Sequence, residues 1–94
     1  SDAYEQYFDA LVRYVYNDPP TGSTSLVVAT HTAALYASAE ISHHLQLLTK
    51  MALSYRQSGT PDIHELTGYL ADFSARLHRD VAYSASQQGR HRGS

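Results

Sequence analysis

The sequence contains no cysteine, few charged residues and no long apolar run, and each of these absences removes a class of function. Without cysteine the chain forms no disulfide, no thiolate nucleophile and no cysteine-based zinc site. No apolar run approaches the ~18 residues of a membrane-spanning helix, so we expect no membrane insertion. Charged residues make up 17% of the 94, against a usual share of about 25%, so Ser, Thr, Gln, His and Tyr must supply much of the polar surface.

The charge balance and the chain start bear on partners and location. A formal net charge of −2 disfavours binding by phosphate neutralisation, so we expect no nucleic-acid partner. No signal-peptide pattern is present, and we expect an intracellular protein, with cytoplasm and nucleus not distinguished. Because the first residue is Ser1 rather than Met, we expect a trimmed fragment or a processed chain. No motif identifies a known family.

The 43% share of hydrophobic residues is enough to build the core of one domain. Proline and glycine gather at three places, which are residues 17–23, 58–61 and 89–94. These clusters punctuate the chain. The last of them has nothing to bury, so we expect a single helical domain over residues 1–88 and a disordered tail over 89–94.

Apolar residues recur at helical spacing in the three segments between the proline and glycine clusters. The spacing predicts helices over residues 3–16, about 25–57 and about 61–87. Gly59 is expected to close the second helix, and Thr60 to cap the third. A kink near residues 38–42 is compatible with the sequence, although nothing there demands one.

Short connections favour antiparallel neighbours, so the predicted fold class is all-α. We expect an antiparallel three-helix bundle with a short first helix and a hairpin of long second and third helices, and dimerisation is left open. The handedness of the hairpin places the first helix beside Val28 and Leu35. The third helix would face it with a seam of mostly small residues, which are His64, Gly68, Ala71, Ala75, His78, Ala82 and Ala85.

The two long helices carry more apolar surface than one hairpin can bury, which leaves an uncovered strip rimmed by Tyr and Arg. We therefore expect a non-enzymatic protein–protein interaction module, serving as an adaptor, a scaffold or an oligomerisation unit. It would bind a partner's amphipathic helix or a second copy of itself. The alternative is that the first helix covers this strip and makes it core. The predicted partner-binding residues are Ala29, Ala33, Tyr36, Leu47, Met51, Tyr69, Arg76 and Arg79.

Six histidines raise a second functional hypothesis. Glu40 and His43 have the Glu-x-x-His spacing of helical di-metal sites, so the alternative function is a carboxylate–histidine metal protein assembled by dimerisation. The main apolar seam of the third helix adds no carboxylate, which disfavours this alternative. No ordered nucleophile, glycine-rich phosphate loop or paired carboxylates occur, and we predict neither catalysis nor a cofactor.

Overall fold

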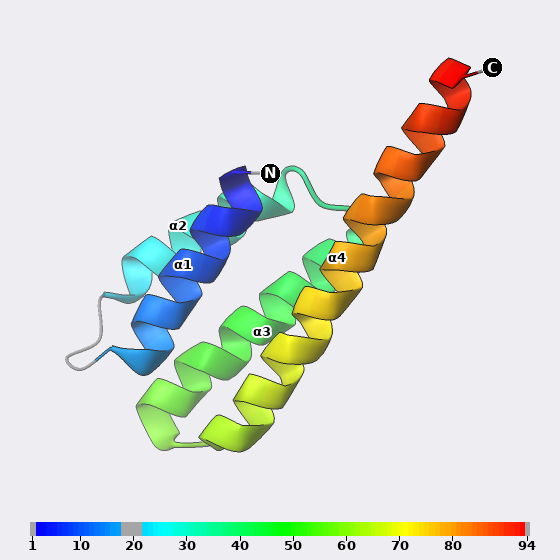
Figure 1. The fold of residues 1–94 in the computed structure, drawn as a ribbon. Coiled ribbons are helices and arrows are strands. Elements are labelled where there is room, and N and C mark those ends of the chain that lie inside the picture. The colour runs from blue at the N-terminus through cyan, green and yellow to red at the C-terminus, as the bar shows by residue number, and fades with distance from the viewer. Residues whose placement is uncertain (1, 18–21, 94) are drawn as a thin grey trace.

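Over the residues that the structure describes, the chain is all-α, as expected, but it forms four helices rather than the predicted three. The computed structural model describes the backbone of residues 2–17 and 22–93, with side chains up to residue 79. Each helix runs antiparallel to the one before it (Figure 1). Over the described residues the helices are α1 (Asp2–Tyr16), α2 (Ser23–Ala34), α3 (Ala39–Ser58) and α4 (Ile63–Gly93).

The helix predicted over residues 3–16 is confirmed as α1. Its buried side chains follow the three-and-four spacing of one helix face and are Ala3, Tyr7, Leu11, Tyr14 and Val15. With this face α1 packs against both α2 and α3. The Tyr7 ring is fully buried.

The predicted single helix over residues 25–57 is wrong, because the chain breaks at residues 35–38. At the end of α2 the amides of Leu35, Tyr36 and Ala37 donate to the carbonyl oxygens three residues earlier, which tightens the last turn. Ser38 then takes an extended conformation, and its hydroxyl accepts the amide of Ile41 at 3.2 Å. This N-cap starts α3 as a separate helix. Helix α2 packs beside α3 and does not form its continuation.

Of the two caps predicted for the connection between α3 and α4, the C-cap of α3 is confirmed and the N-cap of α4 is wrong. Gly59 closes α3 in the left-handed conformation, with φ of 77°, and its amide donates to the Tyr55 carbonyl at 2.8 Å. The predicted cap at Thr60 is wrong, because α4 begins two residues later than that cap requires. The Asp62 carboxylate accepts the amide of Glu65 at 2.9 Å and serves as the N-cap instead.

The expected position of the first helix is also wrong. Val28 and Leu35, which were expected to face it, are 58% and 83% exposed. The small residues predicted to receive it, such as Ala71 and Ala75, are exposed as well. The buried face of α2 carries Leu26, Thr30 and Ala33. The break at residues 35–38 explains the change, since the prediction assumed one continuous helix.

Helix α4 is longer than its partner in the hairpin, with 31 residues against 20 in α3. Figure 1 shows its C-terminal part projecting past the other helices. The bounds of α4 include residues 89–93. The disordered tail expected over residues 89–94 stays a prediction, and residue 94 lies outside the described residues.

Candidate interaction surfaces

The structure divides the predicted partner-binding residues between two surfaces. Ala29 and Tyr36 lie on α2 and its C-terminal end, whereas Ala33 is fully buried in the core and has no surface to offer a partner. The remaining predicted residues lie on the α3–α4 hairpin and are Leu47, Met51, Tyr69, Arg76 and Arg79. The two groups do not form one strip, because α2 folds back on α3.

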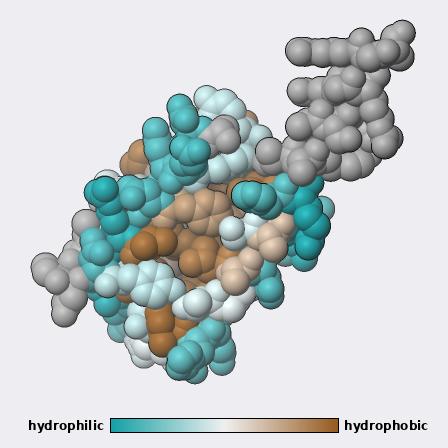
Figure 2. Space-filling model, viewed as in Figure 1, coloured by the Kyte–Doolittle hydropathy of each residue, from teal (hydrophilic) through white to brown (hydrophobic). Residues whose placement is uncertain are grey.

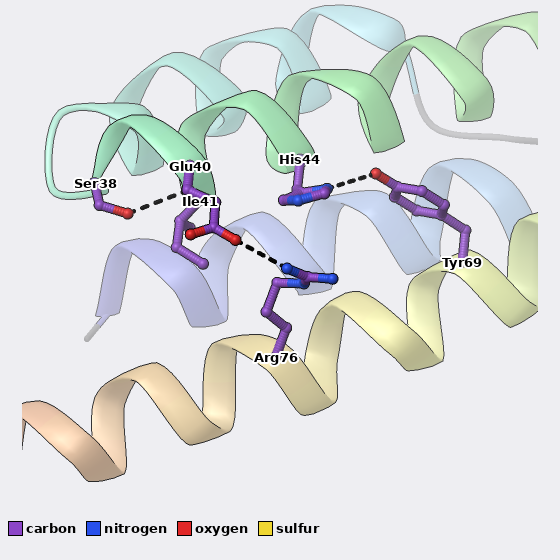
Figure 3. Close-up of polar contacts among 6 residues, drawn as sticks. All are labelled: Ser38, Glu40, Ile41, His44, Tyr69 and Arg76. Atoms are coloured by element: carbon purple, nitrogen blue, oxygen red, sulfur yellow. Dashed lines mark hydrogen bonds and ion pairs between the residues drawn. The ribbon is translucent and has the colours of Figure 1, made fainter.

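Polar side chains on the α3–α4 hairpin are already paired with one another (Figure 3). The Arg76 guanidinium donates to the Glu40 carboxylate at 2.9 Å, and His44 Nδ1 lies 2.9 Å from the Tyr69 hydroxyl. Burial raises the pKa of Tyr69, and the nearby charge of Arg76 opposes this shift. The His44 ring also packs against Phe73, a role that the sequence reasoning missed. Two of the expected rim residues, Tyr69 and Arg76, therefore orient the hairpin itself.

The metal hypothesis gains no support from the described residues. Glu40 is held by Arg76, and the exposed His43 ring lies against His44 with centroids 5.6 Å apart. Within residues 2–17 and 22–79, where side chains are described, no three His, Asp or Glu side chains gather as a metal site requires. Within the described part of one chain, the Glu-x-x-His pair therefore has no further ligands beside it, and a site shared between two copies stays a prediction.

Where α1 meets the α3–α4 hairpin, apolar side chains gather on the face shown in Figure 2. The rings of Phe8 and Phe73 lie 5.9 Å apart across this junction. The Tyr16 hydroxyl lies 2.6 Å from that of Thr67 and joins α1 to α4. Phe8 is half-buried against the core. The chain's own side chains therefore bridge this junction, which is the edge of the core.

Helix α2 differs from the other helices because its sequence contains no Asp, Glu, Lys or Arg. It is nevertheless not covered on all sides. Four of the seven large hydrophobic side chains that are exposed among the described residues belong to α2 and the turn after it. They are Val27, Val28, Leu35 and Tyr36, with exposed fractions of 38%, 58%, 83% and 69%.

A groove runs between α1 and α2 beside this apolar surface. It consists of two adjoining hollows of about 370 and 330 Å³, which share Gln6 and Thr32 in their linings. Most lining side chains are small, so the backbone of another helix can approach closely. The first hollow is lined by Gln6, Ala10, Thr24, Ser25, Val28, Ala29 and Thr32, and the second by Asp2, Ala3, Gln6, Thr32 and Tyr36. We call this surface the α1–α2 groove.

Comparison with known proteins adds no family or relative. No family model matches the chain, and neither the curated proteins nor the solved structures yield a match. Among the described residues, no helix combines the length and the apolar character needed to cross a bilayer.

Proposed function

We propose that this chain is a non-enzymatic protein-interaction module that binds a helix in the α1–α2 groove. One observation carries the proposal: α2, a helix without a formal charge, leaves large apolar side chains exposed beside a groove lined by small residues. The other half of α2 is Ser, Thr and His, but exposed apolar side chains that gather in one place mark surfaces that a partner covers. The partner supplies the missing cover.

The dimensions of the groove suit a short helix. Its lining extends from Thr24 at the start of α2 to Tyr36 just past its end, which is about 18 Å at 1.5 Å per residue. A partner helix of about three turns fills this length. Tyr36 offers it an aromatic contact at one end of the groove and Val28 an apolar contact farther along, and Ala10 and Ala29 leave room for its backbone.

The α3–α4 hairpin, where the sequence alone places the binding strip, supports this function less well. Leu47 is its one large hydrophobic side chain that counts as exposed within the described part of the chain, at 38%. Met51 is half-buried against the core. The contrast with α2, where four such side chains are exposed, favours the α1–α2 groove as the proposed site.

Photo-crosslinking tests the proposal while the partner is still unidentified. Replacing Tyr36 with p-benzoylphenylalanine puts a reactive ketone at the groove, and the same replacement of Leu47 is the matched control on the hairpin. After irradiation in extract of the source cells, mass spectrometry identifies the crosslinked peptide. We expect one helical segment to be captured from position 36 and not from position 47. The same capture from both positions, or from position 47 alone, would contradict the proposal.

A further inference from the structure

Helix α4 projects beyond the bundle as a helix without a neighbour. Arg76 pairs with Glu40, which is near the start of α3, so the hairpin partner ends close to that point. The helix nevertheless continues to Gly93. Residues 80–93, which we call the overhang, span about 20 Å at 1.5 Å per residue. Figure 1 shows no other helix of the described chain beside them. Most helical stability in proteins comes from packing against other elements, so a partner would stabilise this stretch.

The overhang and the α1–α2 groove are two unpaired features of similar length in one chain. The groove is about 18 Å long, and the overhang is about 20 Å long. Figure 1 shows the overhang pointing away from α1 and α2 of its own molecule. The overhang therefore does not reach the groove of its own molecule, which leaves it accessible to the groove of a second one.

Charge favours this pairing. Helix α1, one wall of the groove, carries Asp2, Glu5, Asp9 and Arg13, of which Asp9 and Arg13 form an ion pair at 3.1 Å. The net negative charge of this wall therefore comes from its first turn, where Asp2 lines the groove beside Tyr36. The other wall, α2, carries no formal charge. In the sequence of the overhang the charged residues are Asp80, Arg90 and Arg92. An acidic wall attracts a helix with a basic end, whereas two α1 walls brought together would repel each other.

We propose that the overhang of one molecule docks in the α1–α2 groove of a second copy, and that the second overhang docks reciprocally in the first groove. The pair is a closed twofold dimer with two identical contacts. This inference rests on the proposed function, because it names the helix that the groove binds.

Charge reversal tests the dimer on the full chain. Light scattering over a concentration series from micromolar to millimolar gives the dimer dissociation constant of the wild type. One variant reverses the overhang (Arg90→Glu with Arg92→Glu), and the other reverses the wall (Asp2→Lys with Glu5→Lys). Each is expected to raise the dissociation constant at least tenfold, and circular dichroism checks that both retain their helices. An equimolar mixture of the two restores opposite charges at both contacts, so we expect it to recover most of the wild-type association.

The outcomes separate this inference from the proposed function. A wild type that stays monomeric throughout, or folded charge-reversed variants that dimerise like the wild type, would overturn the dimer. If position 36 then crosslinks to a helix of another protein, the proposed function stands and the second copy is the wrong occupant. If position 36 crosslinks to residues 80–94 of this chain, both are supported. A monomer that crosslinks to nothing from position 36 overturns both.

Discussion

The hydroxyls of Tyr7 and Thr49 lie 3.0 Å apart inside the core. Tyr7 also donates to the Leu45 carbonyl at 3.1 Å, and the hydroxyl of Thr30 lies 2.9 Å from that of Thr49. Three hydroxyls from α1, α2 and α3 therefore lie within hydrogen-bond distance in one cluster, and those of Thr30 and Thr49 also donate to the carbonyls four residues earlier in their own helices. No member of the cluster is left as an unpaired polar group, which would cost about 1–3 kcal/mol. Because each helix supplies one member, the cluster fixes how α1 and α2 sit on α3, and so shapes the α1–α2 groove.

Thr49→Val removes the hydroxyl at the centre of this cluster without changing the shape of the side chain much. We expect the free energy of unfolding to fall by about 0.5–1.5 kcal/mol, because Tyr7 and Thr30 each lose one buried partner but keep donating to the carbonyls of Leu45 and Leu26. Urea unfolding measures the change. Thr32→Val is the matched control, because the Thr32 hydroxyl bonds to the Val28 carbonyl of its own helix, and we expect a change within about 0.5 kcal/mol. Equal losses of unfolding free energy in the two variants would show that the hydroxyl cluster contributes no more to stability than the hydrogen bond of Thr32 within its own helix.

The buried Tyr7 hydroxyl should make the protein sensitive to alkali. Burial raises the pKa of Tyr7 well above its ordinary value of 10.0, and the hydrogen bond to Thr49 offsets only part of that shift. The folded state then holds a proton that the unfolded state releases. The contribution of this bound proton to the free energy of unfolding is complete below pH 10 and is lost progressively as the pH rises toward the folded-state pKa. Unfolding curves between pH 8 and about 12 should show the loss. If the stability of a Tyr7→Phe variant fell with rising pH as steeply as that of the wild type, the alkaline loss of stability would belong to other tyrosines.

Ser38→Ala tests the start of α3. Ser38 is the N-cap, and its hydroxyl accepts the Ile41 amide, so we expect the free energy of unfolding to fall by about 1 kcal/mol. Ser74→Ala, at an exposed position inside α4, is the control and should be neutral or slightly stabilising because Ala has the higher helix propensity. Thermal unfolding of both variants measures the difference. A cap variant as stable as the control would mean that Ser38 does not start the helix.

Leu47 and Leu48 are neighbours in α3 with opposite surroundings. Leu48 is fully buried, whereas Leu47 is 38% exposed. Leu48→Ala should lower the free energy of unfolding by about 2–5 kcal/mol, because it leaves a cavity in the core. Leu47→Ala should cost less than about 1 kcal/mol. Chemical denaturation distinguishes them, and a reversed order would place α3 with the wrong face toward the core.

Local signals in the sequence are enough to predict α1 and the end of α3. The apolar spacing of residues 3–16 fits one helix face, and Gly59 takes the left-handed conformation that ends a helix. The break at residues 35–38 contains neither proline nor glycine, so the usual signals of a helix end are missing there. Ser38 with Glu40 two residues later is only a weak start signal for a new helix.

The prediction of which α2 residues are exposed was wrong, because exposure here depends on the tertiary arrangement and not on local sequence patterns. Which face of α2 meets α1 depends on where the chain folds back, and that single break reverses the roles of Ala33 and Val28. Ala33 becomes core at 0% exposure, and Val28 becomes surface at 58%. The abundance of apolar surface on this stretch is visible in the sequence, whereas its partition between core and groove requires the tertiary arrangement.

The most direct test of the account is a titration with the helix captured by crosslinking. That segment, made as a synthetic peptide, is titrated into the wild type, Val28→Asp and Leu47→Asp, with circular dichroism confirming that all three are folded. We predict that Leu47→Asp binds like the wild type and that Val28→Asp binds at least about tenfold more weakly, which corresponds to about 1.4 kcal/mol. Unchanged binding by Val28→Asp together with weakened binding by Leu47→Asp would contradict the account and assign the partner to the α3–α4 hairpin.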